Sequence, residues 1–172
     1  MNIFVVDTDP RAAGEALCDK HIPKMVLEST QILVSVLRRH GATDDDVPLT
    51  AAGNPHKGGY PSHPSVLWAG DSFCNAHWLY THAHELCSQY TRRYKKVHAC
   101  SPQLAHIATE LHRVPDHGPT DVALCVGPEF QDGQTHAPMD EAVPIYRKFY
   151  IHDKARFAEW KKGVIIPDWW QS

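Results

Sequence analysis

The chain has 172 residues, of which 42% are hydrophobic, with 17 Lys and Arg against 20 Asp and Glu. This length is typical of a single domain with one core, so we expect residues 1–172 to form one domain. The net charge of −3 excludes a globally basic nucleic-acid binder, so that any such function has to come from local patches. No apolar stretch reaches the roughly 18 residues of a transmembrane helix, and we expect no membrane partner.

The first residues lack the basic start and the apolar run of a signal peptide, so we expect a cytoplasmic protein. The five cysteines form no CxxC pair, which indicates reduced and mostly buried thiols. Thirteen histidines raise the hypothesis of a metal site. However, His82 and His84 point to different faces of a predicted helix, and no partner stands at zinc-motif spacing. We therefore expect neither a metal nor a cofactor.

The first half of the chain is organised around one long helix. Residues 2–6 are apolar and predict a short strand or an extended arm, and Asp9-Pro10 predicts a short helix over 11–18. Apolar residues at helical period predict a helix over 22–40, which ends in basic residues followed by Gly41. Residues 41–64 form a long loop, for which a functional role and a mobile surface insertion are equally good interpretations.

The second half predicts three more helices. Residues 63–72 indicate either a connector or the phosphate-binding start of a helix. Helical periodicity then predicts helices over 71–94, from 101 to about 114, and over 144–162, with an irregular segment at 115–140. For Trp169 and Trp170 in the tail, packing on the core is the default. The fold class is accordingly all-α, a compact multi-helix domain with an extended N-terminal arm and long loops.

The segment LCDKHIPKMVLE, residues 17–28, holds the best candidates for acid–base chemistry. His21 and Glu28 are nearly two helical turns apart, so they share a side if the helix includes His21. Glu28 interrupts an apolar run, and a carboxylate in such a place is often partly buried and usable as a general acid or base. The alternative is a solvated or ion-paired glutamate.

Two basic clusters are candidate contacts to DNA. The first comprises Arg92, Arg93, Lys95 and Lys96, and the second is spread with aromatic residues over 142–162. Cations can neutralise phosphates while aromatic rings stack on bases. The alternative is a solvated helix whose aromatic residues form core.

Residues 17–41 and 63–78 together resemble a known family. The sequences LCDKHIPKMVLESTQILVSVLRRHG and HPSVLWAGDSFCNAHW are similar to the small pyrimidine-dimer DNA glycosylases of the phage endonuclease V type, and to short phage-encoded relatives of them. The matching positions are Leu17, Asp19, His21, Glu28, Arg38, Arg39, His40, Pro64, Ser65, Leu67, Ala69 and Gly70. The resemblance covers residues 1–95 and is faint from 141 onward.

The resemblance implies a compact all-α fold and an enzyme that flips a nucleotide out of double-stranded DNA. In the family, the α-amine of the chain attacks the sugar C1′ and forms a Schiff base, assisted by a glutamate. Carried over, the amine is that of Met1, or of Asn2 if Met1 is removed, and the glutamate is Glu28, with His21 nearby. An α-amino group has an appreciable neutral fraction at pH 7, which is the nucleophilic form.

The expected partner is duplex DNA, and the protein is expected to bind it as a monomer. If the protein is phage-encoded, its location is the cytoplasm of an infected bacterium. Taken with the basic clusters, the expected DNA contacts are Lys24, Arg38, Arg39, Ser65, Arg92, Arg93, Lys95, Lys96, Arg147 and Lys148.

Three departures from the family keep other functions open. The second residue is Asn2, larger than the family's threonine, and Leu27 and Gln31 stand where the family has arginines. Segments 41–64 and 96–140 have no evident counterpart. One alternative is a transferase that attaches an amino acid or amine to an activated thymine methyl carbon, with Glu28 and His21 as bases. Another is a DNA-binding module without catalysis.

Overall fold

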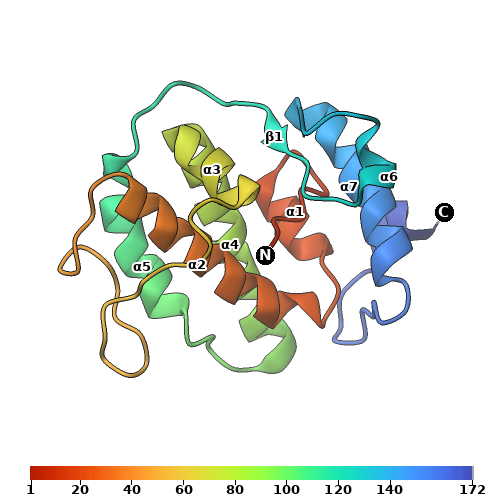
Figure 1. Ribbon diagram of the computed structural model, residues 1–172. Helices are drawn as coiled ribbons and strands as arrows, with labels where there is room; N and C mark the ends of the chain where they lie inside the picture. The colour runs from red at the N-terminus through yellow and green to blue at the C-terminus, as the bar shows by residue number, and fades with distance from the viewer. Residues whose placement is uncertain (172) are drawn as a thin grey trace.

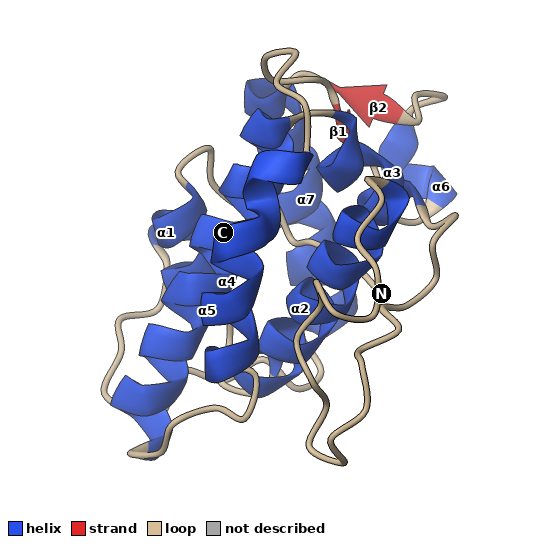
Figure 2. Ribbon diagram, turned by 90° about the vertical axis from the view of Figure 1, so that its left-hand side faces the viewer, coloured by secondary structure: helices blue, strands red, loops and turns tan. Residues whose placement is uncertain are grey.

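The computed structural model describes residues 1–171, and their fold is all-α, as predicted (Figures 1 and 2). The helices and strands are α1 (Pro10–Ala16), α2 (His21–Arg39), α3 (Pro64–Asp71), α4 (Phe73–Tyr94), α5 (Ser101–Glu110), η1 (Leu111–Arg113), β1 (Val122–Ala123), α6 (Pro128–Gln131), β2 (His136–Ala137), α7 (Met139–Lys154) and η2 (Asp168–Gln171). The antiparallel pair β1–β2 lies at one end of the molecule, where β1 contacts α3.

Helix α2 is the centre of the core. Its apolar residues recur at helical spacing, and Ile22, Val26, Leu33 and Leu37 have no exposed surface. The helix packs against α3, α4 and α5, while α1 packs on α4. Because its buried faces are so extensive, α2 holds any polar side chain on its surface at a fixed place in the fold.

Residues 3–6 form an extended arm and not a strand. All four side chains are buried, and Arg147 donates from Nε to the Val6 carbonyl oxygen at 2.7 Å. Trp78 donates its indole N–H to the Thr8 carbonyl at 2.8 Å, just before Asp9 caps α1. The arm is thus held by apolar burial and by side chains from α4 and α7, without a partner strand.

Two sequence predictions needed correction. Residues 64–71 form a complete helix, α3, which His63 and Pro64 begin. The last long helix starts at Met139 and ends at Lys154, instead of spanning 144–162. It ends early because Asp19 binds the segment that follows the helix. The Asp19 backbone N–H donates to the Glu159 carbonyl at 2.8 Å, and the Asp19 carboxylate accepts from the Lys161 N–H at 2.8 Å.

An aromatic cluster joins the arm, the start of α2 and α7. His21 stacks on Phe4 with ring centroids 4.9 Å apart, and its Nδ1 lies 2.7 Å from the Tyr150 hydroxyl. Burial, followed by the nearby Lys154, lowers the pKa of His21 to about 3. Trp169 and Trp170 pack at the edge of this cluster beside Tyr150, which confirms their expected packing on the core.

All five cysteines are free thiols, as predicted. In residues 1–171 there is no helix with the length and hydropathy needed to cross a bilayer.

The first prediction concerns His21 and pH. Between pH 3 and 6.5 the unfolded chain protonates this histidine and the folded chain does not, so stability falls as the pH is lowered through that window. We expect His21→Phe to reduce this slope by up to about 1.4 kcal/mol per pH unit. Urea unfolding at several pH values measures it. The buried His82, whose pKa is lowered to about 4, leaves a residual slope in the variant.

The second prediction compares two neighbouring arginines. The Arg93 side chain is fully buried, pairs with Asp19 at 3.1 Å and donates to the Leu17 and Glu15 carbonyls. Arg93→Met leaves these buried acceptors unpaired and should lower the free energy of unfolding by about 3–5 kcal/mol. Arg92→Met removes a solvent-exposed pair with Glu15 and should cost at most about 1 kcal/mol. Equal effects of the two substitutions in urea unfolding would contradict this.

Candidate active site at the N-terminus

The chain's own amine lies beside Glu28, and the N-terminus is near the middle of the view in Figure 1. The Met1 nitrogen is 4.0 Å from Glu28 Oε2, and the Asn2 backbone N–H donates to the same oxygen at 2.9 Å. Glu28 reaches this point from α2, and its side chain is 14% exposed. The buried arm, residues 3–6, therefore delivers the N-terminus to the one carboxylate that interrupts the apolar run of α2.

The Met1 side chain is packed while its backbone is open. The side chain is only 2% exposed, whereas the residue as a whole is partly exposed, so its exposed surface belongs to backbone atoms. A Cβ atom at Gly59 would lie 3.1 Å from Met1 Cε and 3.5 Å from the Gln31 side chain. Gly59 thus allows the loop between α2 and α3 to close over the methionine side chain, which leaves only backbone atoms of Met1 exposed.

A segment distant in the sequence forms another wall. The Asn2 side chain donates from Nδ2 to the Cys125 carbonyl at 2.7 Å, and the Cys125 Sγ lies 3.2 Å from Ser65 Oγ. The buried Tyr146 hydroxyl accepts from the Cys125 N–H at 3.0 Å and donates to the Ala123 carbonyl. Burial raises the pKa of the Cys125 thiol, which favours its neutral form.

Two further polar side chains flank Glu28. Lys24 Nζ is 3.5 Å from Glu28 Oε1, one helical turn earlier on α2. His63 Nδ1 accepts from the Ser65 N–H at 3.2 Å, which leaves the proton of a neutral ring on Nε2. Burial, and then the N-terminal amine, lower the pKa of His63, while Glu28 raises it. This histidine therefore lies within electrostatic range of both the amine and Glu28, and its lowered pKa favours the neutral ring.

His21 does not belong to this group. It is 3% exposed and lies in the aromatic cluster, where Phe4 and Tyr150 cover its ring. A side chain in that position cannot contact a substrate, and its low pKa disfavours the cationic form. The expectation of a catalytic role for His21 is corrected to a structural one.

Most of the arginines expected to bind DNA have partners within the chain. Arg38 binds Asp44 at 2.7 Å, Arg39 binds Asp71 at 3.0 Å, and Arg92 binds Glu15 at 2.7 Å. Arg147 is engaged with the Val6 carbonyl and with Asp7. Arg93 is fully buried, so the expectation that it contacts DNA was wrong. Lys95, Lys96 and Lys148 are exposed and make no ion pair within residues 1–171.

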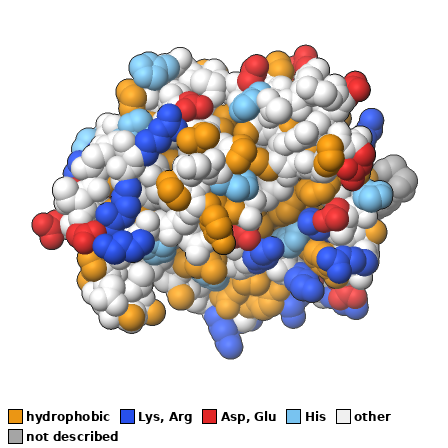
Figure 3. Space-filling view, in the orientation of Figure 1, with side chains coloured by type: hydrophobic (Ala, Val, Ile, Leu, Met, Phe, Trp, Pro, Cys, Tyr) orange, Lys and Arg blue, Asp and Glu red, His pale blue; other side chains and the backbone are white. Residues whose placement is uncertain are grey.

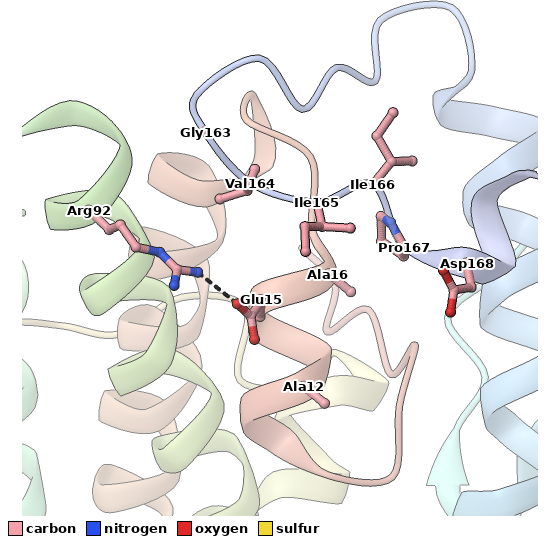
Figure 4. Close-up of a pocket in the computed structure, with 10 residues that line it drawn as sticks. All are labelled: Ala12, Glu15, Ala16, Arg92, Gly163, Val164, Ile165, Ile166, Pro167 and Asp168. Atoms are coloured by element: carbon pink, nitrogen blue, oxygen red, sulfur yellow. Dashed lines mark hydrogen bonds and ion pairs between the residues drawn. The ribbon is translucent and has the colours of Figure 1, made fainter.

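A separate cavity of about 440 Å³ lies away from the amine, between α1, α4 and the segment before η2 (Figure 4). Its wall is mainly apolar, with Val164, Ile165 and Pro167 from the C-terminal segment. The only cation in this lining, Arg92, is tied to Glu15 across the cavity. Within residues 1–171 there is also no cluster of His, Cys, Asp or Glu that could hold a metal ion.

Sequence reasoning named Met1, Asn2 and Glu28, which the structure brings together, but it did not name Gly59, His63 and Cys125. Ser65, expected to contact DNA, is 2% exposed and lies against Cys125, so its burial disfavours that contact as it does for Arg93. Cys125 lies 123 positions after Asn2, and only the folded chain brings the two together. No local pattern marked it. His63 precedes a proline that begins a helix, a capping signal that could have directed attention to it.

Comparison with known proteins adds independent information. The family model of pyrimidine dimer DNA glycosylase matches residues 1–102, which is more than half of the chain and includes Met1, Glu28, His63 and Ser65. No curated protein sequence and no solved structure matches the chain. On the strength of that match, the chain belongs to the pyrimidine dimer DNA glycosylase family.

Proposed function

We propose that this protein excises a damaged pyrimidine from DNA, with the Met1 α-amine as nucleophile and Glu28 as its general acid and base. The single observation that carries the proposal is the placement of the amine, 4.0 Å from a carboxylate that is itself 14% exposed and fixed on the central helix. Membership of a DNA glycosylase family supports the substrate class.

The reaction follows from these two groups. The lone pair of the neutral amine attacks the sugar C1′ of a flipped nucleotide, and the bond from C1′ to the base nitrogen breaks. The electron pair of that bond leaves with the base, which takes up a proton from solvent water, while the amine passes a proton to Glu28. Breaking C1′–O4′ then opens the sugar to a Schiff base, and O4′ takes the proton from Glu28.

A lyase step can follow from the Schiff base. The positive iminium acidifies the hydrogen on C2′, and its removal expels the 3′ phosphate with the electron pair of the C3′–O bond. Glu28, again deprotonated, is the nearest carboxylate to the amine that would carry this sugar. Glu28 thus serves the proton transfers at the amine, at O4′ and at C2′ in turn.

Met1 is the better nucleophile candidate than Asn2. Its side chain is packed against the loop at Gly59, and the Asn2 N–H is already used in a hydrogen bond to Glu28. If Met1 were removed, the new amine at Asn2 would still lie 2.9 Å from Glu28 Oε2. Glu28 is therefore positioned for either amine, and the identity of the amine is a separate question.

The third prediction is a covalent adduct that depends on Glu28. Borohydride reduction of the protein on duplexes with a thymine dimer or an abasic site should trap an adduct. Glu28→Gln should reduce its rate of formation about 10²- to 10⁴-fold, because the general acid and base is lost. Glu15→Gln is the matched control, since Glu15 is an exposed carboxylate on α1 that pairs with Arg92.

Each other outcome has a definite meaning. Binding to DNA without an adduct would exclude the Schiff-base mechanism and favour the thymine-modifying transferase, in which an added amine takes the place of the chain's own. Binding that is unchanged in Glu28→Gln, with no product of any kind, would favour a non-catalytic module.

The fourth prediction is that Met1 is retained and carries the adduct. Intact mass should include the methionine, and after proteolysis the trapped sugar should be found on the peptide that begins with Met1. Because the side chain fills a packed site, its loss should also lower the urea midpoint. An adduct on a peptide beginning with Asn2 would reassign the nucleophile without affecting the role of Glu28.

A further inference from the structure

We infer that a basic track beside Glu28, built mainly by residues beyond the family match, binds the phosphate backbone of duplex DNA on one side of the reacting nucleotide. The inference rests on the proposed function for its substrate. The track consists of Lys20, Lys24, Lys154, Arg156, Lys161 and Lys162, and the last four lie outside residues 1–102.

The track starts at the candidate active site. Lys24 touches Glu28 at 3.5 Å, and Lys20 stands one helical turn before Lys24, at the beginning of α2. In Figure 1 this end of α2 lies beside the loop that follows α7, and in Figure 3 Lys and Arg side chains gather over the same region, at the lower right. The positive surface is therefore continuous with the face that carries the amine.

Aromatic rings hold the cations in place. Lys20 Nζ lies 4.6 Å from the centre of the Phe157 ring, and the Arg156 guanidinium lies 5.4 Å from the same centre. Lys162 Nζ lies 5.1 Å above the Tyr94 ring. A cation–π contact restricts a long side chain but leaves its full positive charge. These three cations are thus ordered without being neutralised.

The acids nearby are already paired. Asp19 binds the buried Arg93 and the Lys161 N–H, Glu159 binds Lys161 at 2.7 Å, and Asp153 binds Lys154. Within residues 1–171, Lys20, Arg156 and Lys162 have no ion-pair partner. By contrast, arginines elsewhere on the surface, such as Arg38 and Arg39, are paired with aspartates. Three unpaired cations of the track, Lys20, Arg156 and Lys162, therefore keep their full charge beside the rings of Phe157 and Tyr94.

The surface between these cations is hollow. A groove of about 480 Å³ is lined by Asp19, Lys20, Tyr94, Phe157, Glu159, Lys161 and Lys162. A groove with cations on its walls matches a phosphate backbone, which releases counterions when lysine and arginine replace them. Lys20 lines this groove, and Lys24, one helical turn later on α2, contacts Glu28, so a strand lying in the groove continues toward the nucleotide at the amine.

The test is the salt dependence of binding. The variant Lys20→Ala/Arg156→Ala/Lys162→Ala is compared with the wild-type protein on a labelled duplex, by anisotropy between 50 and 200 mM salt. Each lost phosphate contact should make the slope of log K against log salt less negative by about 0.9. A change of about 2.7 is therefore expected for three contacts.

Arg11→Ala is the matched control. Arg11 is exposed, also lacks an ion pair within residues 1–171, and lines a different cavity with Phe73. Phe73 and Tyr94 are the two ends of α4, about 30 Å apart along the helix axis. The slope of this control should equal that of the wild type, and urea midpoints should show that both variants are folded.

The outcomes separate this inference from the proposed chemistry. A triple variant with an unchanged slope overturns the track, whatever the trapping experiment shows. A changed slope in a protein that forms no adduct keeps the track and rejects the chemistry. A slope change confined to single-stranded DNA would overturn the assignment to the duplex.

Discussion

The burial of the N-terminal arm against α2 is the constraint on which the rest of the site depends. A chain terminus is usually the most mobile part of a protein, yet here residues 3–6 are buried and the Met1 side chain is 2% exposed. This burial holds a free amine next to Glu28 without help from any catalytic side chain. The proposed nucleophile belongs to the backbone, and its position is set by apolar packing two to five residues away.

The later part of the chain supports the same constraint from the other side. Tyr146 fixes Cys125, whose carbonyl oxygen accepts from Asn2, and Arg147 binds the carbonyl of Val6. Both α7 residues lie outside the segment that the family model matches. The matched part therefore contains the amine and the carboxylate, while the unmatched part holds the arm against them.

Electrostatics divides the basic residues into two classes that composition cannot distinguish. Arg38, Arg39 and Arg92 are paired with acids, and Arg93 is buried in a structural network. The unpaired cations of the proposed track sit on aromatic rings instead. A net charge of −3 is thus compatible with a locally positive surface, because acidic side chains form ion pairs with the arginines of the first class.

The sequence by itself determined the all-α fold, α2 with its basic end, and Glu28 as the carboxylate of interest, because helical periodicity and a charge within an apolar run are local signals. It also identified Met1 and Asn2 through the family resemblance. Only the tertiary structure decided three other features, because each depends on a partner that is distant in the sequence. His21 lies in the core beside Tyr150, and Arg93 is buried with Asp19. Helix α7 ends at Lys154, before the segment in which Glu159 binds Asp19. Gly59 likewise reaches the Met1 side chain, and Cys125 the Asn2 side chain, through long-range contacts that leave no periodic trace in the sequence.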